Sequence, residues 1–172
     1  MGCDMYLNIG KGDNACEIGC WRNANAIHKF FVDKLQNGED DQRESEIDKS
    51  TFEELFEKVS AIREKYIKWD SGTNNLNKLS SEELEEYSSE ELEYHLKSKG
   101  ESWDYLLPKY KEKFDKFCKK TLPTQSGYGF GSASYDIYYI WNAIYTYELI
   151  KEILDNWENK NEDEIYYYTC WW

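Results

Sequence analysis

The chain has 172 residues and a formal net charge of −13, and aromatic residues make up 17% of it. This length fits one domain whose core is large enough to fold without disulfides or a structural metal. The acidic balance disfavours direct binding to nucleic acid or to an anionic membrane, and the aromatic content argues against disorder. We therefore expect a single domain over residues 1–172.

The N-terminus lacks the charged-then-apolar pattern of a signal peptide, and no segment reaches the run of about 20 apolar residues that a membrane helix needs. We therefore expect a cytoplasmic protein without a membrane partner. The five cysteines, an odd number, fit reduced thiols in that compartment. Four of them fall on predicted strands, so a zinc site formed by these four is an alternative: Cys3, Cys16, Cys20 and Cys170. Because the chain has no Cys-x-x-Cys pair, buried apolar thiols are favoured, and we predict no metal and no cofactor.

Apolar and polar residues alternate over residues 3–9 and again over 16–20, with a glycine-containing turn at 10–14. A period of two residues is typical of half-buried strands, so this region predicts a β-hairpin. Its second strand would carry Trp21 and Arg22 to a rim of the domain.

A helix is predicted next, with Asn23 or Asn25 as its N-cap and Gly38 as its stop. On the helical wheel His28 lies at the edge of the buried face. It is expected either as a hydrogen-bonded core residue or as a wall of a pocket.

Residues 39–50 are charged and predict a loop. Ser50 or Thr51 then begins a capping box for an amphipathic helix that runs through Tyr66 and ends at residues 70–75.

Residues 80–95 nearly repeat one octet and hold seven glutamates without a lysine or arginine. We expect an acidic low-complexity insertion at about 70–101. A solvated, partly helical segment is the favoured interpretation, and an acidic face that mimics nucleic acid is the alternative.

Pro108 suits the first turn of another helix, and six lysines over residues 109–120 give it a local positive field. A loop with three alternating glycines follows at residues 122–136 and leads into a long apolar helix from about 134 to 157. The last segment, 165–172, is β-branched or aromatic and predicts a buried strand.

Together these elements predict an α+β fold, in which a small antiparallel sheet of the N-terminal hairpin and the C-terminal strand packs against three or more helices. The glycine loop is the favoured place for a binding site, because helix starts present unpaired N–H groups to an anion. The alternative is an aromatic, glycine-rich connector.

Both ends of the chain carry recognisable blocks: residues 1–7 (MGCDMYL), 21–32 (WRNANAIHKFFV) and 122–127 (LPTQSG), the last continuing to 130–132 and 135–136. Together the blocks resemble a widespread family of small, mostly uncharacterised bacteriophage proteins. The resemblance implies a viral origin and the cytoplasm of the host cell, and it carries no activity over. This chain departs from the family pattern with Cys3 where leucine is common, Asn23 where lysine is common, and Gly129 within a commonly aromatic run.

All three blocks contribute polar or aromatic residues to a predicted pocket: Asp4, Trp21, Arg22, Asn25, His28, Thr124, Gln125, Ser126, Gly127, Tyr128, Phe130, Gly131, Tyr135 and Asp136. One cation, several hydrogen-bonding groups and aromatic walls suit a nucleotide-like ligand. Arg22 would pair with a phosphate, and Trp21, Tyr128 or Phe130 would stack on a ring.

We therefore expect a phage counter-defence protein that binds and sequesters a small anionic ligand, such as a nucleotide immune signal of the host. The first alternative is an acidic inhibitor of a host defence protein, such as a CRISPR nuclease, that acts as a nucleic-acid mimic. The second is a nucleotide-modifying enzyme in which His28 is the base, Asp4 or Asp136 orients it and Ser126 is the nucleophile. Binding is favoured over catalysis because no motif spacing supports such a triad. Homo-oligomerisation stays open.

Overall fold

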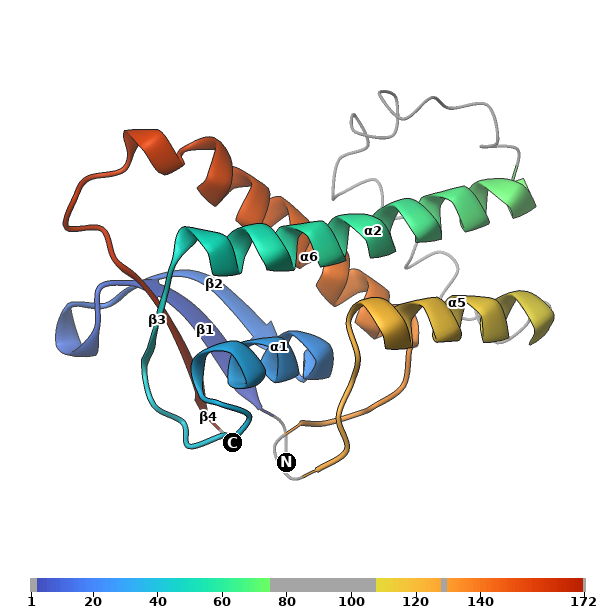
Figure 1. The fold of residues 1–172 in the computed structure, drawn as a ribbon, viewed down its shortest axis with the longest axis horizontal. Helices are drawn as coiled ribbons and strands as arrows, with labels where there is room; N and C mark the ends of the chain where they lie inside the picture. The colour runs from blue at the N-terminus through green and yellow to red at the C-terminus, as the bar shows by residue number, and fades with distance from the viewer. Residues whose placement is uncertain (1–2, 75–107, 128–129, 172) are drawn as a thin grey trace.

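The structure is a computed structural model that describes residues 3–74, 108–127 and 130–171. Its helices and strands follow one another along the chain as β1 (Asp4–Ile9), η1 (Gly12–Asn14), β2 (Cys16–Arg22), α1 (Asn25–Leu35), β3 (Ser45–Ile47), α2 (Lys49–Asn74), α5 (Pro108–Thr121), α6 (Ile137–Asp155), η3 (Trp157–Asn159) and β4 (Tyr166–Trp171) (Figure 1).

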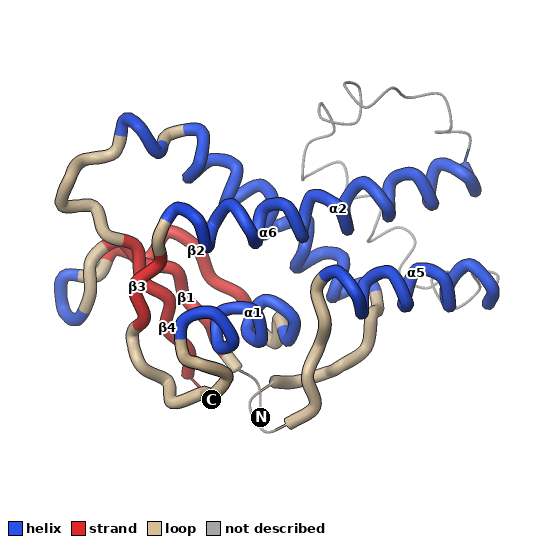
Figure 2. The backbone as a smooth tube through the Cα atoms, viewed as in Figure 1, coloured by secondary structure: helices blue, strands red, loops and turns tan. Residues whose placement is uncertain are grey.

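The strands form one antiparallel sheet in the order β2-β1-β4-β3 (Figure 2). Leu7 of β1 lies opposite Gly19 of β2 on one side and Tyr168 of β4 on the other. The α+β class, the N-terminal hairpin and the pairing of the two ends of the chain in one sheet are therefore confirmed.

Helices α1 and α6 cover one face of this sheet, and the start of α2 reaches the same sheet where the Phe52 ring meets Tyr166 of β4 at a centroid distance of 5.3 Å. Tyr168 of β4 stacks on Phe31 of α1 with ring centroids 4.4 Å apart. The indole N–H of Trp21 donates to the hydroxyl of Thr146 on α6 at 2.8 Å. The long helix α2 packs along α6 above this layer, and α5 lies beside the C-terminal half of α2. Trp21 is thus a core residue, and the prediction that it would lie at a rim is wrong, because its ring faces α1 and α6.

Helix α6 contacts strand β2 at Gly19. A Cβ atom built on Gly19 would stand 2.4 Å from Cδ2 of Leu149, so a side chain at this position would require the end of the Leu149 side chain to move. One residue on, the backbone N–H of Cys20 donates to the hydroxyl of Tyr145 at 3.3 Å. This bond satisfies a backbone donor on β2, which is an edge strand of the sheet as far as the described residues show.

Strand β3 was not predicted, because residues 39–50 were expected to be a loop. It pairs with β4, with Ser45 opposite Tyr168. Only three residues long, it places an exposed Glu46 between a buried Ser45 and a buried Ile47. Such a stretch is too short and too charged to show the alternation that identifies a strand.

Two helix starts also differ from expectation. Helix α2 begins at Lys49, because the carboxylate of Asp48 accepts the backbone N–H of Thr51 at 2.8 Å and so acts as the cap expected of Ser50 or Thr51. Helix α1 begins at Asn25 after Ala24, which makes no side-chain capping bond.

Most of the predicted acidic insertion lies outside the described residues, and its first residues, 70–74, continue α2. Among the described helices, none is both long enough and apolar enough to cross a bilayer.

Removing residues 166–172 should abolish cooperative unfolding, because β4 is the central strand that joins β1 to β3. Thermal unfolding followed by circular dichroism tests this expectation. The matched control is Trp171→Ala, which changes only an exposed side chain of β4 and should unfold cooperatively. An unchanged melting curve for the truncated chain would contradict the role given to β4.

Replacing the α2 cap by Asp48→Ala should lower the free energy of unfolding by about 0.5–2 kcal/mol at neutral pH. Hydrogen bonds from Thr51 hold the pKa of Asp48 below its ordinary 3.8. The carboxylate therefore contributes its full stabilisation above pH 3.8 and loses it as the pH falls through the lower folded-state pKa.

Urea denaturation at neutral and strongly acidic pH measures the effect of Asp48→Ala. Asp48→Asn is the control, since an amide oxygen still accepts the Thr51 N–H without titrating. If wild type and Asp48→Ala were equally stable at neutral pH, the capping assignment would be wrong.

Candidate functional site

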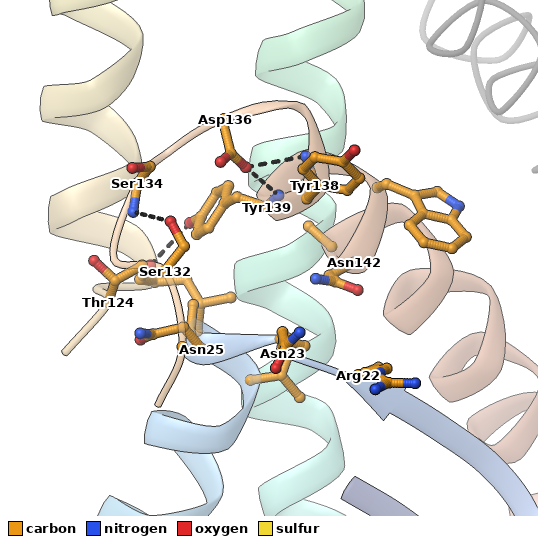
Figure 3. A pocket seen from close by; sticks show the side chains of 17 residues that line it. Arg22, Asn23, Asn25, Thr124, Ser132, Ser134, Asp136, Tyr138, Tyr139 and Asn142 are labelled. Carbon is orange, nitrogen blue, oxygen red and sulfur yellow. Dashed lines mark hydrogen bonds between the residues drawn. The ribbon is translucent and has the colours of Figure 1, made fainter. Parts of the chain in front are cut away.

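A pocket of about 630 Å³ opens between the turn after β2, the loop over residues 122–134 and the first turns of α6 (Figure 3). This volume lies within the range of about 300–1,000 Å³ that is typical of small-molecule sites. Five of the predicted site residues line it: Arg22, Asn25, Thr124, Gly131 and Asp136.

The loop over residues 122–134 is held to α1 by one amide side chain. The backbone N–H of Gln125 donates to Oδ1 of Asn25 at 2.7 Å, and Nδ2 of Asn25 donates to the Gln125 carbonyl at 2.8 Å. The Asn25 amide therefore pairs with Gln125 as a neighbouring strand would. Gln125 takes part through its backbone, and its side chain is not among those that line the pocket.

Further bonds brace the same loop from within. The hydroxyl of Thr124 donates to the Ala133 carbonyl at 2.8 Å, and the Thr124 N–H donates to the hydroxyl of Tyr135 at 3.2 Å. The hydroxyl of Tyr139 donates to the Leu122 carbonyl at 2.8 Å. Burial raises the pKa of Tyr139, which keeps this phenol a hydrogen-bond donor. Hydrogen bonds within the protein itself therefore fix the shape of this wall of the pocket.

The start of α6 is already occupied by an anionic group of the protein itself. Oδ1 of Asp136 accepts the backbone N–H groups of Tyr138 and Tyr139 at 3.0 and 3.1 Å. The expectation that the N–H groups at this helix start would bind an external anion is therefore wrong for Tyr138 and Tyr139, because both already donate to the Asp136 carboxylate.

The glycines of the loop do not form a phosphate cradle within the described residues. Gly131 has a φ of +72° and lines the pocket, where a Cβ would lie 3.5 Å from Cβ of Asn23. Gly127 is exposed, as is Ser126, and neither lines the pocket. Tyr128 lies outside the described residues. The close approach that Gly131 permits is to the turn after β2.

Arg22 is the cation of the pocket. Its side chain is 78% exposed, and its Nε lies 3.7 Å from Oδ1 of Asp4, its cross-strand neighbour. An exposed pair at this distance is weak, so the guanidinium remains available to a ligand.

Two exposed aromatic rings on α6 line the same pocket as Arg22. Tyr138 is 68% exposed and Trp141 43% exposed, and both line the pocket one helical turn apart. Asn142 lines it as well, and its side-chain amide makes no hydrogen bond within the described part of the chain. None of the three was predicted as a site residue. Consecutive residues of a helix point about 100° apart, so Trp141 lies to one side of the buried Ile140. This position off the apolar face is the sequence signal that would have placed Trp141 at the surface.

His28 and Phe130 lie in the core, not in the pocket. His28 is 0% exposed; its Nδ1 lies 2.5 Å from the Tyr168 hydroxyl and its Nε2 lies 2.9 Å from Oδ2 of Asp40. Phe130 packs on its ring at a centroid distance of 4.6 Å. Burial lowers the pKa of His28 despite the Asp40 carboxylate. The prediction that His28 lies at the edge of the buried face is therefore wrong, because its side chain points from α1 toward β4.

Asn25→Ala should destabilise the protein by about 1–3 kcal/mol, because it leaves the N–H and carbonyl of Gln125 without their partners. Urea denaturation measures the loss, and amide hydrogen exchange should show faster exchange at Gln125. Asp33→Ala is a control on the same helix, since it changes an exposed side chain whose ion pair is with Lys29. Unchanged protection of the Gln125 amide in Asn25→Ala would contradict the bracing role.

Comparisons of the chain with models of known protein families, with curated proteins and with solved structures find no significant match.

Proposed function

We propose that the pocket beside Arg22 binds a small anionic, nucleotide-like ligand and retains it, as a phage protein that sequesters a host immune signal would. The observation that carries this proposal is the combination, in one cavity of about 630 Å³, of an exposed guanidinium with the exposed rings of Tyr138 and Trp141. Flat rings stack on bases of any sequence, and a guanidinium pairs with a phosphate through two parallel hydrogen bonds.

The remaining lining groups suit the edge of a base. Asn142 brings a side-chain amide with donor and acceptor atoms, and Figure 3 shows it between Arg22 and the start of α6. Asn23 brings an amide whose Oδ1 already accepts the Cys3 N–H at 3.1 Å, so it offers chiefly its NH₂ donors. Ser132 and Ser134 add hydroxyls along the opposite loop. With Arg22 as the cation among the lining residues, a ligand with a single phosphate group matches the pocket better than one with several.

Binding without turnover fits this lining better than catalysis does. The residues that line the pocket include no histidine, cysteine or lysine among those the structure describes. Asp136 is the one carboxylate among the described lining residues, and it accepts two backbone N–H groups. His28, the base of the enzymatic alternative, faces Asp40 and Tyr168 inside the core.

The acidic-mimic alternative rests on the net charge of −13 and on the glutamates of residues 80–95. It requires a protein partner that binds the acidic segment, whereas the sequestration proposal requires the pocket. The two are separated by variants that change one and leave the other intact.

The decisive experiment is to identify small molecules that leave with the protein. The chain is purified from phage-infected bacteria, denatured, and the released molecules are analysed by mass spectrometry. Sequestration predicts release of an intact nucleotide-like compound in a near-stoichiometric amount. Release of a chemically altered compound, together with multiple turnover of the nucleotide from which it derives, would establish the enzyme instead.

Arg22→Ala and Trp141→Ala should each weaken binding of the released compound tenfold or more by calorimetry, since a charged hydrogen bond and a stacked base are each worth about 1–3 kcal/mol. Trp171→Ala is the matched aromatic control, because Trp171 is exposed on β4 and does not line the pocket. Arg43→Ala is the control for charge, because Arg43 pairs with Asp41 elsewhere on the surface.

The same assay on a variant with Glu82, Glu83, Glu85 and Glu86 replaced by glutamine should show unchanged affinity. If this variant instead lost binding to a host protein while Arg22→Ala kept it, and if salt weakened that binding strongly, the acidic-mimic function would replace the proposal.

A further inference from the structure

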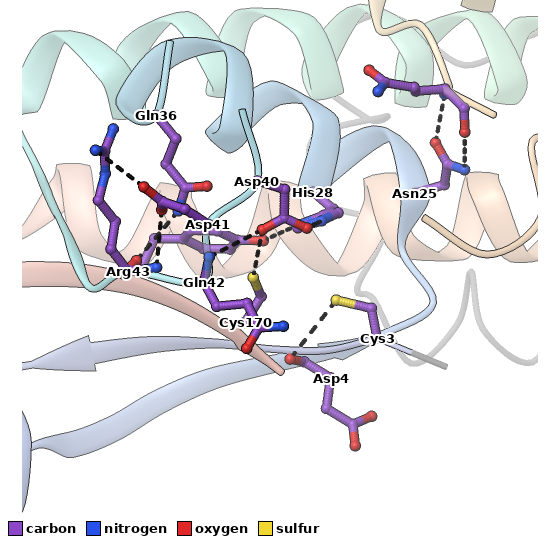
Figure 4. A network of polar contacts seen from close by, with 12 residues as sticks. Cys3, Asp4, Asn25, His28, Gln36, Asp40, Asp41, Gln42, Arg43 and Cys170 are labelled. Carbon is purple, nitrogen blue, oxygen red and sulfur yellow. Dashed lines mark hydrogen bonds and ion pairs between the residues drawn. The ribbon is translucent and has the colours of Figure 1, made fainter. Parts of the chain in front are cut away.

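A cluster of metal-ligating side chains lies in the core, away from the pocket. Cys3 at the start of β1, His28 on α1 and Cys170 on β4 are all buried, and their ligand atoms lie within 4.8 Å of one another. Figure 4 shows the Cys170 thiol directed at the Asp40 carboxylate, which lies between Cys170 and His28, while the Cys3 thiol faces the carbonyl of Asp4. Cys3 and Cys170 come from opposite ends of the chain, and His28 and Asp40 come from α1 and the loop that follows it.

We propose that Cys3, His28, Cys170 and Asp40 form a binding site for one zinc ion. Two sulfur atoms, one imidazole nitrogen and one carboxylate oxygen are the ligand types that zinc accepts in a four-coordinate site. Calcium and magnesium prefer oxygen ligands throughout, so the two thiols select against them.

The spacing of these atoms is close to that of a tetrahedral site. Zinc bonds of about 2.0–2.3 Å at tetrahedral angles place neighbouring ligand atoms about 3.3–3.8 Å apart. Sγ of Cys170 lies within this range, 3.4 Å from Oδ1 of Asp40. Nε2 of His28 lies 2.9 Å from Oδ2 of the same carboxylate, so this pair would separate by about 0.4 Å around an ion. The widest pair in the Cys3, His28 and Cys170 set, at up to 4.8 Å, needs to close by about 1 Å.

The surroundings of His28 supply the outer support that metal-bound imidazoles have. Its two ring nitrogens face the Tyr168 hydroxyl and the Asp40 carboxylate. Because Asp40 is itself a proposed ligand, Nε2 is the nitrogen that would bind the zinc, and Nδ1 keeps the Tyr168 hydroxyl as a hydrogen-bond partner that fixes the orientation of the ring.

Binding requires no oxidant or other co-reactant. Two thiols become thiolates as two sulfur–zinc bonds form, and their two protons pass to the solvent. His28 binds as the neutral imidazole and Asp40 as the carboxylate. The resulting site joins the first strand, α1, the loop after it and the last strand through one ion.

This set differs from the four cysteines that the sequence left as an alternative zinc site, Cys3, Cys16, Cys20 and Cys170, and it also differs from the prediction of no metal. Cys16 and Cys20 are exposed on β2, whereas Cys3 and Cys170 are buried with His28. This difference supplies matched controls, because the exposed pair can be removed without touching the cluster.

The test uses the untagged full chain, reduced and freed of metal by a chelator that is then removed. Zinc is titrated against a chromophoric chelator, and cobalt(II) is added to a second sample as a spectroscopic probe. We expect one equivalent of zinc, together with a sulfur-to-cobalt charge-transfer band and the intense visible bands of tetrahedral cobalt. Cys3→Ala and Cys170→Ala should each weaken zinc binding at least tenfold and lose the charge-transfer intensity, whereas the double variant Cys16→Ala/Cys20→Ala should keep both.

Thermal unfolding provides the second measurement. Zinc should raise the melting temperature of the wild type and of the Cys16→Ala/Cys20→Ala variant, and should leave Cys3→Ala unchanged. Cys3→Ala decides the matter if Cys170→Ala fails to fold, because Cys170 lies in the central strand β4. Absence of stoichiometric binding, or a cobalt spectrum that survives Cys3→Ala and disappears in the exposed-cysteine variant, would overturn the proposal.

Discussion

The insertion of β4 between β1 and β3 is the interaction on which the rest of the structure depends. It joins the last strand of the chain to the first and brings Tyr168 to the centre of the domain, where the ring stacks on Phe31 and the hydroxyl meets His28. Without this strand, β3 would lose its partner and α1 would lose the surface it covers. Because these pairings join residues more than 100 positions apart, they close the domain only when both ends of the chain are present.

Regular periodicity made much of this fold predictable. The alternation of residues 3–9 and 16–20 identified the hairpin, and the aromatic run near residue 166 identified the last strand. The choice of partner for a polar side chain was not predictable in the same way. Asn25 has the chemistry of a helix cap, yet it pairs with the backbone of Gln125, and Asp48 caps α2 where Ser50 or Thr51 was expected. Such choices depend on which distant segment approaches, and local sequence does not carry that information.

The sequence predicted which segments surround the pocket more accurately than which side chains line it. The turn after β2 and the loop over residues 122–134 do come together, because Asn25 and Gln125 connect them. Trp21, His28 and Phe130 were expected there and lie in the core, while Tyr138 and Trp141 stand at the pocket. Residue type alone does not distinguish an aromatic side chain that packs in a core from one that lines a pocket. The distinction depends on the direction in which the side chain leaves its helix or strand.

The two proposed sites share a short piece of backbone. Asn23 lines the pocket, and its backbone N–H donates to the Cys3 carbonyl at 2.9 Å while its Oδ1 accepts the Cys3 N–H at 3.1 Å. Its φ of +57° turns the chain from β2 into α1 at this point. A change that fixes the position of Cys3 would therefore also fix Asn23, a lining residue of the pocket, through these two hydrogen bonds.

The capping role of Asp136 gives the pocket a polarity. Its carboxylate and the Arg22 guanidinium belong to opposite sides of the cavity, as Figure 3 shows. A ligand with a charged end and a neutral ring would be repelled at one side and attracted at the other, so it would enter in a single orientation. A ligand charged at both ends would meet Asp136 with one of its anionic groups, and the pocket would discriminate against it by electrostatic repulsion alone.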